Sequence, residues 1–140
     1  MVINFTLPCS IQSISYLDEV VPFVIEQSGE VTQHRFYFAL HEILINSYES
    51  VQSQYGDQTE MNSLVVSIEL NQEEVIGIVT DNGGGDIHQC QAIVNEKQIE
   101  ETLFEDRGRG LLLVRELVDD VSFQKGNGDN VITTIRKRRT

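Results

Sequence analysis

The sequence predicts an α+β fold, a two-layer sandwich with helices on one face of a mixed, mostly antiparallel sheet. Segments with alternating apolar residues are distinct from longer segments in which apolar residues recur every three or four positions. Their order is β-α-α-β-β-loop-α-β-β, which separates a helical layer from a strand layer. The 140 residues are 40% hydrophobic and contain no repeat or linker, so we expect one domain over residues 1–140.

The first half of the chain supplies a strand and two helices. Apolar residues alternate from Ile3 to Leu7, which predicts the first strand. Ser10 or Ser13 could cap a helix that continues to about Gln27, and Pro22 could kink or divide it. A longer helix is expected from about Thr32 to Gln54. Its apolar stripe consists of Phe36, Leu40, Ile43, Leu44, Tyr48 and Val51.

The second half supplies most of the sheet. Leu64–Leu70 and Val75–Thr80 alternate across a polar turn and predict an antiparallel pair. A loop follows, then a long connection after Ile87 that could hold a short helix. A further helix is expected to begin near Gly108. The chain closes with a predicted hairpin, whose strands are Val121–Gln124 and Val131–Arg136.

The net charge, the apolar runs and the cysteine spacing disfavour several classes of protein. A formal net charge of −12 disfavours nucleic-acid binding, which needs a basic surface. The basic segment 136–139 is interpreted as the solvated end of the last strand. No apolar run is long enough to cross a bilayer, and the N-terminus has no secretory pattern. Cys9 and Cys90 lack metal-ligand or disulfide spacing, so we expect free thiols, a cytoplasmic protein and no membrane partner.

Glu42 and Asn46 are four residues apart in the second predicted helix, so they lie on the same side, one turn apart. An amide oxygen suits Mg²⁺, whose remaining ligands can be phosphates and waters. A nearby carboxylate can accept a proton from an attacking hydroxyl or water. The alternative is that both side chains simply face solvent.

Asp81 follows a predicted strand and precedes Gly83, Gly84 and Gly85. Its carboxylate can accept a hydrogen bond from an exocyclic amino group such as that of adenine. The glycines permit positive φ and the close approach of a flat ring. An ordinary turn would use the same residues.

Gly108-Arg109-Gly110 stands immediately before an apolar helix. Backbone N–H groups at a helix start can bind phosphate, and Arg107 and Arg109 could add cationic hydrogen bonds. Neither a Walker-type nor a Rossmann-type glycine motif is present. A glycine-rich entry turn with two solvent-facing arginines is the other interpretation.

Taken in this order, the three motifs resemble the N, G1 and G2 boxes of the GHKL ATPase/kinase superfamily, over nearly the whole chain. The segment GRGLLLVRELVDDV and the short length are most similar to bacterial anti-sigma-factor serine/threonine kinases. The resemblance implies a single histidine-kinase-like ATPase domain with the Bergerat fold, with ATP and Mg²⁺ bound under a flexible lid.

The resemblance also implies a role for each matching residue. Glu42 would be the catalytic base, Asn46 the Mg²⁺ ligand and Asp81 the residue that reads adenine, while Gly83 and Gly85 would shape the base pocket. On the phosphate side, four residues would lie close to the nucleotide. Gly108 and Gly110 would flank the phosphates, and either Arg107 or Arg109 would reach the γ-phosphate.

The implied function is a kinase that transfers the γ-phosphate of ATP to a serine of an antagonist protein. As an anti-sigma factor it would bind a sigma factor and regulate transcription by partner switching, and the resemblance also implies a homodimer. Other functions stay open: a catalytically weak ATP-binding module that acts through protein contacts, a simple ATPase, or an excised histidine-kinase catalytic domain. From the length of 140 residues we expect no upstream helical domain of the kind found in a complete sensor kinase.

Overall fold

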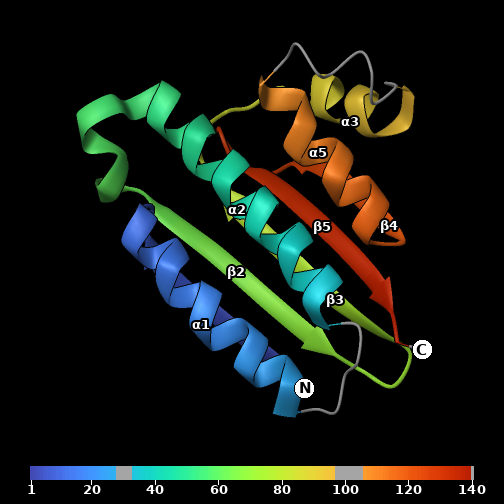
Figure 1. The fold of residues 1–140 in the computed structure, drawn as a ribbon. Helices are drawn as coiled ribbons and strands as arrows, with labels where there is room; N and C mark the ends of the chain where they lie inside the picture. The colour runs from blue at the N-terminus through green and yellow to red at the C-terminus, as the bar shows by residue number, and fades with distance from the viewer. Residues whose placement is uncertain (28–32, 97–105, 140) are drawn as a thin grey trace.

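The computed structural model describes residues 1–27, 33–96 and 106–139 (Figure 1). Its strands are β1 (Val2–Pro8), β2 (Ser63–Leu70), β3 (Glu74–Asp81), β4 (Asp120–Lys125) and β5 (Val131–Arg138). Its helices are α1 (Ile11–Gln27), α2 (Gln33–Tyr55), α3 (Ile87–Glu96) and α5 (Asp106–Leu117), with a 3₁₀ turn at Gly56–Met61. The predicted α+β sandwich is confirmed.

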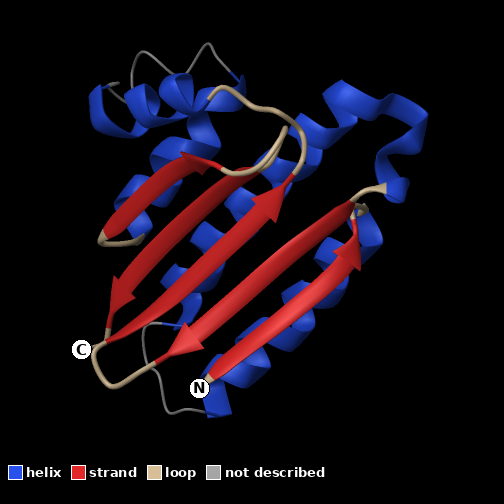
Figure 2. Cartoon of the chain, turned by 180° about the vertical axis from the view of Figure 1, so that it is seen from behind, coloured by secondary structure: helices blue, strands red, loops and turns tan. Residues whose placement is uncertain are grey.

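The five strands form one sheet in the order β1-β2-β3-β5-β4, and every neighbouring pair is antiparallel. The mixed, mostly antiparallel sheet that we expected therefore has no parallel pair among the described strands. The hairpins β2–β3 and β4–β5 impose this direction locally. Figure 2 shows the other face of the sheet, over which no described helix lies.

The core lies between the sheet and the helices, with α2 across the middle of the sheet (Figure 1). The predicted stripe of α2 is buried except for Tyr48, which is half-buried. Gly77 of β3 permits this packing, because a Cβ there would lie 3.0 Å from the Phe36 ring. Burial of this stripe holds α2 in place, and with it the polar residues on the adjacent face of the helix.

The cap of α1 is Ser10, since its Oγ accepts a hydrogen bond from the Ser13 N–H at 3.1 Å. The helix continues through Pro22 to Gln27 without a break. Asp18 joins α1 to α2, because its carboxylate accepts a hydrogen bond from the Tyr37 hydroxyl and lies 2.8 Å from His41 Nδ1. Burial, and secondarily the Asp18 carboxylate, raise the pKa of Tyr37.

The helix α5 begins at Asp106, so Gly108-Arg109-Gly110 lies within its first turns rather than ahead of it. Helix α3 lies in the connection where a short helix was expected, and packs against α5 and β4. None of the helices in the described part of the chain is long and apolar enough to span a membrane.

Candidate functional site

The site is built on a polar strip of α2 formed by Glu42, Asn46 and Ser50, which follow one another at four-residue intervals. Each member meets a different segment of the chain. Glu42 lies against α5, Asn46 lines a pocket beside α3, and Ser50 lies against the loop after β3. One face of one helix therefore brings together all three sequence motifs.

Glu42 and Gly110 are in close contact. A Cβ on Gly110 would lie 2.7 Å from Glu42 Oε2, which is closer than real Cβ contacts. The absence of a side chain at residue 110 thus leaves space for this carboxylate beside α5. The predicted base and the last glycine of the third motif are neighbours in the structure.

The glycines after β3 serve two different purposes. A Cβ on Gly83 would lie 2.7 Å from both Ser50 C and Val51 N, so only glycine lets the loop approach the α2 backbone. At Gly85 the nearest atom to such a Cβ is Ser50 Oγ, at 3.2 Å. Positive φ was expected as an option for all three glycines, but in this loop only Gly84 uses it, with φ +66°. Close packing on α2 is the reason for the other two.

Asp81 ends β3 and is only 4% exposed. Its Oδ1 accepts a hydrogen bond from the Gly83 N–H at 2.8 Å, and the Ser47 side chain bonds the same carboxylate. Burial raises the pKa of Asp81, although both hydrogen bonds act in the opposite direction. A carboxylate is therefore held at the end of a buried strand at a cost in desolvation.

Cys9 lies in the same buried region. Burial and the Asp81 charge together raise the pKa of its thiol to about 11. Cys9 is thus a thiol with little nucleophilic character at neutral pH. Neither Cys9 nor Cys90 is in a disulfide bond, and Cys90 is half-exposed.

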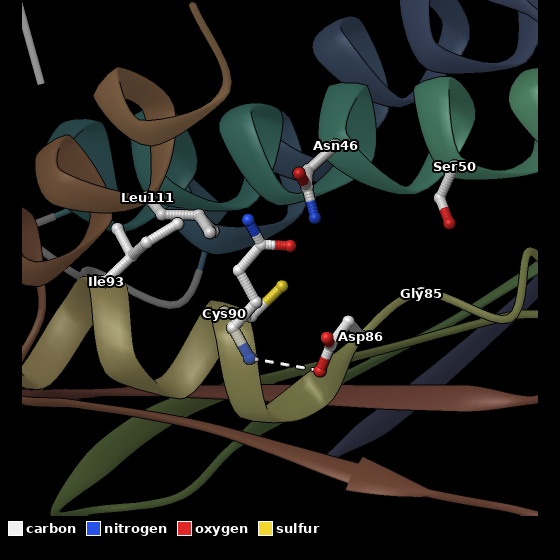
Figure 3. Close-up of a pocket in the computed structure, with 8 residues that line it drawn as sticks. Asn46, Ser50, Gly85, Asp86, Cys90, Ile93 and Leu111 are labelled. Atoms are coloured by element: carbon white, nitrogen blue, oxygen red, sulfur yellow. Dashed lines mark hydrogen bonds between the residues drawn. The ribbon is translucent and has the colours of Figure 1, made fainter. Parts of the chain in front are cut away.

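A pocket lies between the strip on α2, the start of α3 and α5 (Figure 3). Asp86 caps α3, because its Oδ1 accepts hydrogen bonds from the N–H groups of His88 and Gln89 at 3.0 and 3.1 Å. The pocket encloses about 80 Å³, whereas sites for drug-sized ligands enclose roughly 300–1,000 Å³. Its lining consists of Asn46, Ser50, Gly85, Asp86, Gln89, Cys90, Ile93 and Leu111.

The remaining predicted residues belong to the first turns of α5. Arg109 is exposed, and Gly110 precedes Leu111, which lines the pocket. Arg107 and Gly108 are helical by their backbone, but their side-chain surroundings lie outside the described part of the chain. The structure thus places Gly83, Gly85 and Gly110 next to α2, which carries Glu42 and Asn46. Asp81 lies beneath the loop and does not line the pocket.

Sequence analysis did not identify four residues of this site, namely Ser47, Ser50, Asp86 and Cys90. The sequence does mark Ser50, since it continues the four-residue spacing of Glu42 and Asn46. It also marks Asp86, because an aspartate before an apolar segment is a typical helix cap. Ser47 bonds Asp81 of β3 and Cys90 lines the pocket beside α2, and no local sequence pattern marks either position.

The residue types fit a nucleotide with Mg²⁺. No group of three or more His, Cys, Asp or Glu side chains could hold a metal ion within residues 1–27, 33–96 and 106–139. A metal bound here would therefore need phosphate oxygens and waters beside an amide such as that of Asn46, which is how Mg²⁺ is usually held. The buried Asp81 acceptor suits the amino group of a base.

A sequence model of the histidine kinase-like ATPase domain matches residues 27–136. The chain belongs to this family. The GHKL resemblance is thereby confirmed, and the ATPase domain implies ATP as its ligand and a kinase-like use of it.

Among solved structures, the chain is similar to a chain of the SiaB–SiaC complex from Pseudomonas aeruginosa. The two share 17% sequence identity with a TM-score of 0.68, over 97% of this chain and 89% of the other. At this identity the likeness shows the fold. No curated protein matches the sequence.

Proposed function

We propose that this histidine kinase-like ATPase domain is a protein serine/threonine kinase that acts as an anti-sigma factor. The observation that carries the proposal is the strip on α2, where Glu42 and Asn46 face the segments that contain the other two motifs. A base and a metal-ligating amide would then lie next to the glycines of a phosphate-binding turn. Proximity of this kind is most of what phosphoryl transfer requires from a protein.

Each of these residues would have a separate role in binding ATP and Mg²⁺. Asp81 would accept a hydrogen bond from the adenine amino group, and Gly83 would keep the loop against α2. Asn46 would ligate Mg²⁺, which supplies charge neutralisation at the phosphates. The N–H groups of the first turn of α5, at Arg107 and Gly108, would bind phosphate oxygens, and Gly110 would flank them.

In the transfer step Glu42 would accept the proton of the substrate hydroxyl. The hydroxyl oxygen forms a bond to the γ-phosphorus as the bond from that phosphorus to the ADP oxygen breaks. Arg107 or Arg109 would stabilise the charge on the transferred group. Because the pocket encloses about 80 Å³ here, nucleotide binding would move α3 away from α2.

The partners are proposed from the fold and the resemblance together. The similar solved structure is a SiaB–SiaC complex, so a protein of this fold binds another protein. For this chain we propose a sigma factor and a serine-containing antagonist as alternative partners in the cytoplasm, with regulation of transcription as the outcome. Residues 1–140 would act as one domain, and as a homodimer.

The decisive experiment compares Glu42→Gln with the wild type, using Glu49→Gln as a matched control because Glu49 is an exposed glutamate on the same helix. Removal of the base should lower phosphoryl transfer to the antagonist by roughly 10²–10⁴-fold. ATP affinity, measured by calorimetry, should stay within about threefold. Normal transfer in Glu42→Gln would exclude Glu42 as the base.

A second candidate is a catalytically weak module in which ATP only shapes a partner-binding surface. The position of Glu42 favours it, because the carboxylate lies against Gly110 of α5 and Glu42 does not line the pocket. In that case wild-type protein would bind ATP but phosphorylate no partner. Phosphate release without any protein substrate would indicate a simple ATPase, and transfer to histidine an excised histidine-kinase domain.

A further inference from the structure

Helix α2 carries a polar side chain in the middle of its buried face. Ser47 is only 1% exposed. The residues one turn away on the same face are apolar and equally buried, namely Ile43, Leu44 and Val51. An alanine would fit the same space and has a higher intrinsic helix propensity. A serine hydroxyl buried among apolar side chains therefore requires a hydrogen-bond partner that justifies its presence.

That partner is the carboxylate of Asp81, at the end of β3. The Ser47 hydroxyl donates a hydrogen bond to this carboxylate, and the Gly83 N–H donates another to Oδ1 at 2.8 Å. One donor belongs to α2 and the other to the loop after β3, so two separate elements fix the orientation of the carboxylate. A carboxylate can accept about four hydrogen bonds, and acceptor positions therefore remain for a ligand.

Burial works against the negative charge of this carboxylate. Asp81 is 4% exposed, and desolvation raises its pKa. The hydrogen bonds from Gly83 and Ser47 both lower the pKa of Asp81, because each donor stabilises the ionised form. The Gly83 donor is a backbone group, whereas the other donor depends on the side chain at residue 47. Ser47 is thus the side chain that helps Asp81 to stay ionised in a buried position.

The charge state of Asp81 decides which groups it can bind. An ionised carboxylate only accepts hydrogen bonds, whereas a protonated one also donates a hydrogen bond. The amino group at C6 of adenine is a donor, so it pairs with the ionised form. The Ser47 hydroxyl has a single hydrogen, and by donating it to Asp81 it leaves the carboxylate as an acceptor.

We propose that Ser47 is a positioning residue for base recognition, which holds the Asp81 carboxylate as the acceptor for a purine nucleotide with an amino group at C6. The inference rests on the proposed function, in which Asp81 binds adenine, and it adds the residue that sets the strength of this contact. Ser47 acts through Asp81 and not on the base itself. Its expected effect is therefore confined to nucleotides that carry the amino group.

The position of Ser47 also ties base recognition to the proposed Mg²⁺ ligand. Asn46 and Ser47 are consecutive, and at about 100° per residue their side chains leave α2 in different directions. Asn46 lines the pocket beside α3, whereas Ser47 reaches Asp81 of β3. One segment of α2 backbone thus fixes a side chain at each end of the proposed nucleotide site.

The test is the preference of the protein for ATP over purine riboside 5′-triphosphate, which has hydrogen in place of the amino group. Calorimetric titrations with Mg²⁺ give two dissociation constants, whose ratio isolates the contact between the amino group and Asp81. We expect wild type to bind ATP at least roughly tenfold more tightly, as for a hydrogen bond to a charged group. In Ser47→Ala this preference should fall to about threefold or less, because ATP alone binds more weakly. A purely structural role would weaken both nucleotides equally and leave the ratio unchanged.

Ser13→Ala is the matched control and should keep the wild-type ratio. Ser13 is a buried serine of α1, and its hydroxyl also bonds one side chain, that of Ser10. A second pair of variants separates the hydroxyl from packing, since Ser47→Thr and Ser47→Val have side chains of the same shape and only threonine keeps the hydroxyl. We expect Ser47→Thr to prefer ATP more strongly than Ser47→Val does.

The outcomes distinguish this inference from the proposed function on which it rests. A wild-type ratio in Ser47→Ala, or equal ratios in Ser47→Thr and Ser47→Val, would overturn the role of Ser47 and leave ATP binding by this site intact. A wild type that binds neither nucleotide, or binds both equally well, would overturn the adenine contact of Asp81 and the role of Ser47 together.

Discussion

At the residue scale, the role proposed for Asp81 in binding adenine comes with a cost in stability. Burial raises its pKa, so the charged form is disfavoured where it stands. An asparagine has the same shape and can still accept the hydrogen bond from the Gly83 N–H. A buried carboxylate that an uncharged isostere could replace is a typical mark of a functional site.

We therefore predict that Asp81→Asn has a melting temperature equal to or above that of wild type at neutral pH, yet does not bind ATP. For wild type, ATP at a hundredfold excess over Kd should add about 2.7 kcal/mol. Asp57→Asn, at an exposed aspartate of the 3₁₀ turn, is the control and should keep this gain. Thermal melts with and without Mg-ATP measure both effects, and a nucleotide-induced rise in Asp81→Asn would exclude the adenine contact.

The same group gives a pH dependence with a definite sign. Between the ordinary pKa of 3.8 and the raised native value, the folded protein binds more protons at Asp81 than the unfolded chain does. Its contribution to stability therefore falls as pH rises through this window. Urea denaturation over that range should show a stability difference between Asp81→Asn and wild type that grows with pH. A difference that shrinks instead would contradict the assigned burial effect.

Gly83 is a second residue whose environment is decisive. A Cβ there would lie 2.7 Å from backbone atoms of Ser50 and Val51, which cannot move without displacing α2. We predict that Gly83→Ala lowers the free energy of unfolding by about 1–3 kcal/mol. Gly85→Ala is the matched comparison and should cost less, because its nearest neighbour is the Ser50 hydroxyl at 3.2 Å. Equal losses in urea denaturation would show that the approach to α2 is not what requires Gly83.

At the scale of elements, the packing of α5 on α2 sets the position of the proposed base. The two helices meet where Gly110 faces Glu42. Glycine inside a helix is unfavourable by up to about 1 kcal/mol relative to alanine, so its presence in α5 calls for a reason. Space for the Glu42 carboxylate is that reason.

Gly110→Ala should then separate stability from activity. The free energy of unfolding should change by less than about 1 kcal/mol, since the helix gains propensity and the end of a flexible side chain can move. The displaced carboxylate should lower phosphoryl transfer by at least tenfold while ATP affinity changes little. Leu113→Ala, at an exposed position one turn along α5, is the control for changes to this helix. Unchanged transfer in Gly110→Ala would mean that Glu42 does not act from this position.

At the scale of the whole molecule, net charge opposes self-association. Each chain carries −12, so two copies repel. If the proposed homodimer forms, raising NaCl from about 50 to about 300 mM should strengthen it by screening this repulsion. Sedimentation at several salt concentrations measures the effect. A dimer that weakens with salt would instead depend on ion pairs across its interface.

The amino-acid sequence alone determined the layer architecture, the positions of the elements and the three motifs, because periodicity, caps and glycine turns are local properties. Spacing put Glu42 and Asn46 on one side of α2, and the structure agrees. Tertiary structure decided what each motif faces. Ser47 reaches Asp81, Ser50 meets the glycine loop, and Gly110 adjoins Glu42, since these pairs are distant in sequence and only the packing of α2 on β3 and α5 brings them together. It also decided that β1 lies at an open edge, because strand order depends on long-range pairing.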